Sequence, residues 1–310
     1  MRSKFHLAPL FLILQAGAAL ASEPSCVPLP IPALHPQEAR GYIRGPGRYC
    51  LQQDITAVSR FDIHAGSYKS FAEQGLIRID CDKNDACVKD DYSIDLQNRK
   101  VRAKAADMGG ITNTSGGMNV AIRNGRIEVP GKSRSNVAIS LRWQYTPFAV
   151  LGKRCLLEDP KCQDIPASQT DGKRAPDYER GGYLIDNVNI RAGWRGVQMG
   201  GSGNILRTSV IEVDSSTAAV FFGPGAIVEN NTIIIHGKGE HGDFDAALKL
   251  RDAHGAVVRN NTFIYRGGLF SSAPAAINLL DSRDVLIEAN TFKGFKQPVR
   301  ENGATTYTLK

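Results

Sequence analysis

The strongest constraint on the fold is one line of sequence that the chain repeats. AVVRNNTFIY (256–265) is a near copy of AIVENNTIII (226–235), and related segments begin at residues 93, 119, 183, 204 and 285. Each copy has two apolar clusters separated by a polar kink. The apolar residue after the kink falls at Val101, Ile127, Ile190, Ile211, Ile233, Phe263 and Phe292. Because the copies are short and no helical pattern separates them, the repeat predicts a solenoid of short strands.

A second short strand recurs between these copies, in GVQMG, AVFFG, ALKLR, AINLL and PVREN. Each coil therefore supplies one strand to each of several parallel sheets, and about eight to ten coils are expected. Asparagine recurs at the kink because a tight turn there requires left-handed backbone, and the stacked amides are expected to bond along the column. These kink residues are Asn98, Asn124, Asn187, Asn230 and Asn260.

The N-terminus has the form of a secretory signal. Arg2 and Lys4 precede an apolar run that ends in small residues at Ala19-Leu20-Ala21, so residues 1–21 are expected to be removed. Residues 22–47 then form an N-terminal extension or cap. No later segment has the ~20 consecutive apolar residues of a membrane helix. The sequence predicts an exported protein, periplasmic or extracellular, without a membrane span.

The chain has six cysteines, and an exported chain meets oxidising conditions. Sequence proximity favours Cys81 with Cys87 and Cys155 with Cys162, each pair closing a short polar insertion. Cys26 and Cys50 would then tie the N-terminus to the main body. This is one of about fifteen possible connectivities. Zinc is the weaker alternative, because no CxxC spacing occurs.

The formal net charge is +7, and removal of Arg2 and Lys4 leaves +5 (7 − 2). This excess favours an acidic partner, although a solvated basic surface is the simple alternative. Nucleic acid is not expected, because an exported chain with no basic runs and interleaved aromatics lacks the usual binding pattern.

The segments GPGRYCLQQDI and SIDLQNRKV, with the repeated NNTI and NNTF, resemble the right-handed parallel β-helix of the pectate-lyase-like superfamily. The resemblance covers residues 48–310 and implies an all-β fold. The step from Ile127 to Ile190 is too long for one coil and contains a Pro-rich, charged stretch, so a large loop insertion is expected at about 143–181. It specifies the fold better than the activity, since related folds carry lyases, hydrolases, epimerases and proteins without catalysis.

The resemblance also implies where a site would be. The strands like ALKLR form the sheet that lines the cleft, with outward residues expected at Ser140, Gln198, Phe221, Lys249, Asn278 and Arg300, and at Arg142 and Arg251 one step further along. Their neighbours in the strands are apolar, which supports the assignment independently. The basic groove over this sheet would be formed by Arg142, Arg195, Lys249, Arg251, Arg266 and Arg300.

The loop HGKGEHGDFDA, which starts at residue 236, gathers acids and bases before Lys249. β-Elimination from an acidic sugar needs a base and a cation that neutralises the carboxylate. The candidates are Lys249 and Arg251, with His241 or Tyr265 as the other proton-transfer partner and Glu240 and Asp243 beside them. Trp194 and Phe221 could stack on a sugar. A solvated turn with no chemistry is the alternative.

Two other classes of function stay open, a glycoside hydrolase or epimerase on the same scaffold and a non-catalytic protein, and so does a requirement for calcium. A glycoside hydrolase needs two opposed carboxylates, for which Glu240, Asp243 and Asp245 are candidates, but polygalacturonase, pectate-lyase and epimerase signatures are all missing. Calcium is possible, although Asp243 and Asp245 supply only two ligands. A non-catalytic scaffold, adhesin or polysaccharide organiser is the second class of hypothesis. The expected partner is a polysaccharide, acidic in character, and the oligomeric state is not specified.

Overall fold

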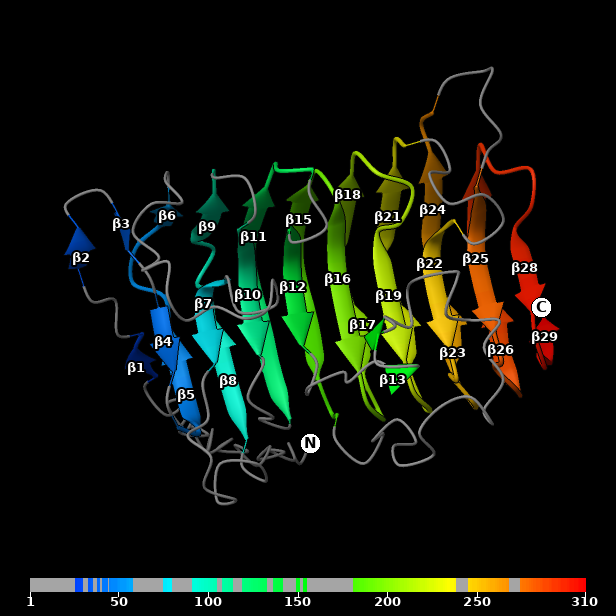
Figure 1. Cartoon of the computed structure of the whole chain (residues 1–310), viewed down its shortest axis with the longest axis horizontal. Helices are drawn as coiled ribbons and strands as arrows, with labels where there is room; N and C mark the ends of the chain where they lie inside the picture. The colour runs from blue at the N-terminus through cyan, green and yellow to red at the C-terminus, as the bar shows by residue number, and fades with distance from the viewer. Residues whose placement is uncertain are drawn as a thin grey trace, which may run out of the picture.

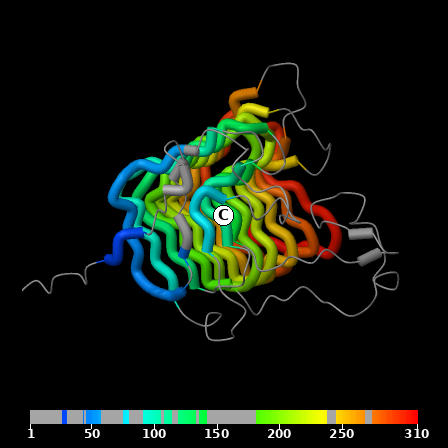
Figure 2. The backbone as a smooth tube through the Cα atoms, turned by 60° about the vertical axis from the view of Figure 1, so that its left-hand side comes forward, coloured from blue at the N-terminus to red at the C-terminus, as the bar shows by residue number. Residues whose placement is uncertain are grey.

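The protein is a right-handed parallel β-helix, in which the chain winds through the same sheets once per coil (Figures 1 and 2). This computed structural model describes residues 26–29, 33–35, 38–39, 41–43, 45–57, 75–79, 91–104, 108–113, 119–132, 136–141, 149–150, 153–154, 181–237, 245–267 and 274–310. No residue in these ranges is helical. Accordingly, none of the described segments forms an apolar helix of the length that a membrane crossing requires.

A nine-stranded parallel sheet faces the viewer in Figure 1. Its strands lie side by side in sequence order, because each coil adds one strand at the C-terminal edge. They are β4 (Gly41–Ile43), β7 (Gly75–Ile79), β10 (Gly109–Asn113), β12 (Val137–Leu141), β16 (Arg195–Gly200), β19 (Ala219–Phe222), β22 (Ala246–Arg251), β25 (Ala275–Leu280) and β28 (Val299–Asn302).

The remaining strands of the β-helix form a sixteen-stranded sheet with two arms, which share the long strands β11 and β15. The first arm contains β1 (Val27–Pro28), β5 (Gly47–Cys50), β8 (Tyr92–Asp95), β11 (Val120–Val129), β15 (Leu184–Ala192), β17 (Ile205–Arg207), β20 (Ile227–Glu229), β23 (Val257–Arg259), β26 (Val285–Glu288) and β29 (Tyr307–Leu309). The second arm adds β6 (Ile55–Ala57), β9 (Lys100–Ala103), β18 (Val210–Val213), β21 (Thr232–Ile235), β24 (Thr262–Tyr265) and β27 (Thr291–Lys293).

Two small antiparallel pairs stand outside these sheets: β2 (Ala33–His35) with β3 (Glu38–Ala39), and β13 (Ala149–Val150) with β14 (Lys153–Arg154). At the N-terminus, β1 pairs with β5 and β4 pairs with β7, so strands before residue 48 already join the sheets. The predicted disulfide Cys26–Cys50 is confirmed and ties β1 to β5. The other two predicted pairs, at Cys81, Cys87, Cys155 and Cys162, lie outside the described residues.

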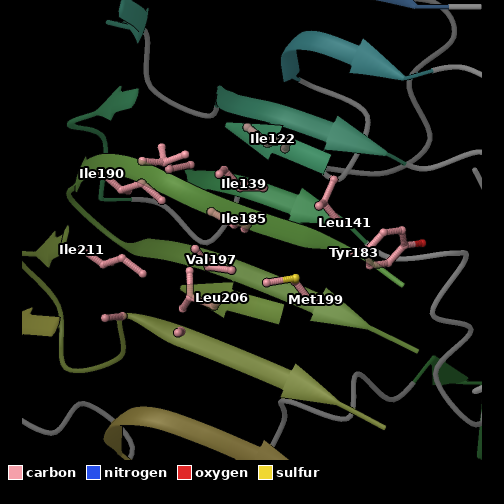
Figure 3. Packing of buried hydrophobic residues seen from close by; sticks show 14 of the residues in the cluster. Ile122, Ile139, Leu141, Tyr183, Ile185, Ile190, Val197, Met199, Leu206 and Ile211 are labelled. Atoms are coloured by element: carbon pink, nitrogen blue, oxygen red, sulfur yellow. The ribbon is translucent and has the colours of Figure 1, made fainter. Parts of the chain in front are cut away.

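The apolar rung predicted by the repeat is confirmed. Adjacent strands of the second arm pair these residues directly, in the order Val101, Ile127, Ile190, Ile211, Ile233, Phe263 and Phe292. Figure 3 shows Ile190 and Ile211 in this core, with Ile139, Val197 and Met199 of the nine-stranded sheet. Phe263 stacks on Phe292 with ring centroids 5.4 Å apart. Each coil thus buries its apolar face only against its neighbours.

The left-handed kink is also confirmed, since Asn98, Asn124, Asn187, Asn230 and Asn260 have φ between 55° and 60°. The predicted column of hydrogen-bonded amides, the amide ladder, does not run along these five residues. Between their side chains the structure gives one hydrogen bond, from Asn187 Nδ2 to Asn124 Oδ1 at 2.9 Å.

The ladder is formed instead by the residue after the kink, which points inward. Asn231, Asn261 and Asn290 lie in successive coils, and each amide bonds to the next and to a backbone carbonyl. Their side-chain oxygens also accept backbone N–H groups that the turn would otherwise leave buried without a partner. The prediction of stacked amides was therefore right in kind and wrong by one residue, because the left-handed residue turns its own side chain outward.

The outer face of the first arm has a column of charges whose sign alternates from coil to coil, which we call the ion ladder. Its members, each paired in register with the next, are Asp95, Arg123, Asp186, Arg207, Glu229, Arg259 and Glu288. Arg207 reaches Asp186 at 2.8 Å and Arg259 reaches Glu229 at 2.7 Å. The ladder favours the native register, because a slip by one coil would bring like charges together.

The ion ladder makes the stability of the fold depend on pH. Burial alone would raise the pKa of Asp186, but hydrogen bonds from Arg207 and Thr208 and the charges of Arg207 and Arg123 lower it overall. The contribution of the Asp186 carboxylate to the free energy of unfolding is therefore fully present above the unfolded pKa of ~3.9, and it is lost as pH falls through the lower folded pKa.

We expect Asp186→Asn to lower the melting temperature at pH 7, and the difference in melting temperature from wild type to shrink at acid pH below the unfolded pKa. The matched control is Asp91→Asn, at an exposed aspartate outside the ladder; an equal deficit at both pH values would contradict this account.

Candidate functional site

The outer face of the nine-stranded sheet has a column of mostly polar and basic residues. Strand pairing aligns them rung by rung, which confirms that Gln198, Lys249 and Asn278 share a column. In register, the column in the described residues contains Tyr42, Arg78, Thr112, Ser140, Gln198, Val220, Lys249, Asn278 and Arg300. We call it the central column.

One predicted member of this column was wrong. Phe221 was expected to face outward, but it pairs with Met199 and Leu250 and is fully buried in the core. Val220 occupies the outward position instead, between Gln198 and Lys249. Every residue from Ala219 to Phe222 is apolar, so alternation does not distinguish the two faces, and a shift of one residue exchanges them.

A second outward column lies two residues further along each strand. It contains Gly200, Phe222, Arg251, Leu280 and Asn302. Among the described residues, neither outward column has a carboxylate, whereas Lys249 and Arg251 lie on one strand and Arg300 lies two coils away. The charged residues of the two columns between β22 and β28 are therefore all basic, whereas the ion ladder on the first arm alternates in sign.

Lys249 is the basic residue whose surroundings are best defined. Its Nζ lies 3.6 Å from Oδ1 of Asp245, the residue directly before β22. The Asp245 side chain is only 1% exposed, while that of Lys249 is 21% exposed. The buried Asp245 carboxylate thus positions the Lys249 ammonium group at the surface of the sheet. Asp245, which sequence reasoning considered only as an acid or a calcium ligand, is therefore the counterion of Lys249.

Trp194 and Arg195 lie where the chain enters β16. Arg195 is buried, and its guanidinium donates to Oε1 of Gln198 at 3.3 Å. The same guanidinium lies 5.9 Å from the Trp194 ring centroid. The Ser215 hydroxyl donates to the Trp194 carbonyl and fixes the turn. These contacts bring Trp194, Arg195 and Gln198 together at β16 and the turn that leads into it.

The C-terminal coils complete this face with amide groups. Asn302 donates from Nδ2 to Oδ1 of Asn278 at 2.6 Å, and Arg300 donates from Nε to Gln297 at 3.2 Å. Asn278 is buried, and Arg251 keeps 14% of its side chain exposed. The polar groups of the face are thus fixed by neighbours before any ligand arrives, which lowers the entropic cost of binding.

Tyr265 and Arg266 are not part of this face. Tyr265 lies at the end of β24 in register with Ile235 and packs against Phe295 with ring centroids 5.8 Å apart. Arg266 NH1 lies 3.5 Å from Glu212 Oε1. The sequence placed both near the groove because the loop after β24 leads into β25, but their side chains belong to the end of the second arm.

Glu212 is the centre of a charged cluster that the sequence analysis did not identify. Its Oε1 lies 2.7 Å from His236 Nε2 and 3.1 Å from Arg191 NH1. Burial alone would raise the pKa of Glu212, but the hydrogen bond from His236 and the charges of Arg191 and Arg266 lower it overall. The signal was present in the register, since Glu212 and Arg191 pair directly.

Several candidates cannot be placed. The proposed acids and bases Glu240, His241 and Asp243, together with Arg142, lie outside the described residues. Within the described residues, no group of three His, Cys, Asp or Glu side chains is close enough to hold a metal ion. Asp245, one of the two carboxylates considered for calcium, pairs with Lys249.

Comparison with known proteins supports the fold. Residues 178–307 match the family described as "Right handed beta helix region". Searches of curated proteins and of solved structures find no match. The match covers the coils from β15 to β28. It does not extend to the pectate-lyase-like superfamily, which stays a prediction from the sequence.

Proposed function

The chain is a right-handed parallel β-helix repeat protein, and we propose that it is an exported protein that binds an acidic polysaccharide along its nine-stranded sheet and cleaves it by β-elimination. The observation that carries the proposal is the basic run of Lys249, Arg251 and Arg300 on outward columns that have no carboxylate in the described residues. A polyuronate carries a carboxylate on every sugar, so neighbouring sugars could place carboxylates against the cations of β22 and β28.

The charges of the other faces support this choice. On the first arm every cation of the ion ladder has an acidic neighbour in the adjacent coil, and on the second arm Glu212 binds both Arg191 and Arg266. A polyanion would gain little there, because its charge would compete with acids already in place. On the nine-stranded sheet the acids that lie near Lys249 and Arg251, Asp245 and Asp252, stand outside the two outward columns.

In the proposed reaction Lys249 neutralises the substrate carboxylate. Proton abstraction next to that carboxylate places negative charge on it, and a fixed ammonium group stabilises this charge more in the transition state than in the ground state. The Asp245 carboxylate, 3.6 Å from Lys249 Nζ, would fix the position of the ammonium group for this role. Arg251 and Arg300 bind carboxylates of neighbouring sugars. The proton-transfer group is assigned to His241 by sequence alone.

Hydrolysis is less well supported than elimination. It requires two carboxyl groups on opposite sides of the bond, typically ~5–10 Å apart. Of the described carboxylates next to β22, Asp245 is buried against Lys249 and Asp252 lies 3.7 Å from Arg251. Both are thus engaged with cations rather than facing each other across an open space.

We expect Lys249→Ala to reduce the formation of unsaturated products from a polyuronate at least ~100-fold, as loss of one stabilising charge does in other active sites. The assay follows ultraviolet absorbance and new reducing ends in parallel, with and without calcium. Lys293→Ala, at an exposed lysine on β27 of the other sheet, is the matched control and should retain wild-type rates. Reducing ends without unsaturated products would replace elimination by hydrolysis. Binding without either product would leave a scaffold or adhesin.

A further inference from the structure

The first arm has an aliphatic stripe on its outer face, beside the ion ladder. One residue per coil belongs to it, in register from β15 to β26, and each is only partly buried. Its members are Leu184, Ile205, Ile227, Val257 and Leu286. An outward position in a solvated sheet usually takes a polar residue, so five consecutive aliphatic ones indicate a surface that is covered in use.

The stripe and the ladder run parallel across the same strands, with the ladder two residues further along each. The pairs are Ile205 with Arg207, Ile227 with Glu229, and Val257 with Arg259. The residues that precede the stripe include Gly203 and Gly255, at positive φ, where a Cβ would meet nothing within 4 Å. No bulky side chain at these two positions obstructs approach to the stripe from that side.

We propose that this face is the interface of a homodimer. Consider a two-fold axis that lies in the interface, parallel to the strands, and passes between β17 and β20. Such an axis keeps the position along each strand and reverses the order of the coils. The stripe therefore meets the stripe, and the ladder meets the ladder, in an isologous contact.

Every contact made by this operation is complementary. Along the ladder, Arg207 meets Glu229 of the second copy, Asp186 meets its Arg259, and Arg123 meets its Glu288. Because the charges alternate along the ion ladder, an axis that passes between two strands brings residues of opposite charge in the two copies together. An axis that passes through a strand would instead bring residues of like charge together. The second arrangement is thereby disfavoured by repulsion.

The apolar stripe has the same symmetry about that axis. Ile205 meets Ile227 at the centre, Leu184 meets Val257, and Leu286 meets Ala121. At the ends, Ser93 of β8 meets Thr308 of β29, so the stripe becomes polar on both sides at the same distance from the axis. The contact extends over eight coils, about 35 Å at ~4.8 Å per strand, with the apolar part in the middle and ion pairs along one edge, as stable interfaces are built. The proposal does not depend on the polysaccharide or on catalysis.

The test is the mass of the purified protein in solution, by sedimentation velocity across a concentration series. We expect a dimer for wild type, and a dissociation constant raised at least ~30-fold by Ile227→Lys, which places a cation against Ile205 of the second copy. Val210→Lys is the control, because Val210 is the equivalent exposed aliphatic residue on the second arm, 39% exposed, and should leave the dimer intact. Circular dichroism and the melting point check that both variants fold.

A wild-type protein that is monomeric throughout the series would overturn the proposal. So would a dimer that Ile227→Lys leaves unchanged, or one that Val210→Lys disrupts equally.

Discussion

Asn261→Ala is expected to destabilise the fold by about 3–5 kcal/mol, although it removes only one small polar side chain. Asn261 Oδ1 accepts both the backbone N–H and the Nδ2 of Asn231, each at 3.0 Å. Its Nδ2 donates to Val228 O at 2.8 Å and to Asn290 Oδ1 at 2.9 Å. The site is 1% exposed, so water cannot replace these partners, and each buried group left without one costs about 1–3 kcal/mol.

The adjacent asparagine provides the control for this prediction. Asn260 is exposed, and its contribution is a left-handed backbone at φ 55°. Glycine adopts that conformation without strain, so Asn260→Gly should change the free energy of unfolding by less than about 1 kcal/mol. Chemical denaturation of both variants measures the difference. Equal losses of unfolding free energy for the two variants would mean that the amide ladder does not contribute more to stability than the turn residue does.

Phe221→Ala should also cost about 3–5 kcal/mol, because it opens a cavity in the centre of the core. Phe221 is fully buried between Met199 and Leu250 of the adjacent coils. A sugar-stacking residue would behave differently, since its loss would weaken ligand binding and leave the melting temperature nearly unchanged. Phe221→Leu keeps most of the volume and is expected to cost less than about 1.5 kcal/mol. A stable Phe221→Ala protein with impaired polysaccharide binding would contradict the inward placement.

The repeat predicted the architecture because each coil of a solenoid makes the same local contacts and the same turn. The apolar position after each kink and the left-handed asparagine are both set by residues within a few positions of one another. The sequence did not show which asparagine forms the amide ladder. NNT contains two asparagines, and only backbone geometry decides which of them turns inward.

The site was predictable where strand alternation was unambiguous and failed where it was not. Gln198, Lys249 and Asn278 fall in one column because their neighbours are apolar on both sides. In AVFFG every residue is apolar, so alternation does not distinguish the two faces, and Phe221 was placed outward. The link between Asp245 and Lys249 depends on the turn into β22. The bonds from Glu212 to His236 and Arg266 cross from one coil to others, and the sequence pattern does not encode such contacts.

The central claim is that the nine-stranded sheet recognises acidic polysaccharide, and calorimetric titration of the purified protein with a polyuronate and with a neutral polymer of the same length tests it most directly. The account predicts at least ~10-fold tighter binding of the polyuronate, weakened by salt as charge pairing requires. The preference should be lost when Lys249 and Arg251 are both replaced by alanine. Equal affinity for the two polymers, or a preference that survives the double replacement, would contradict it.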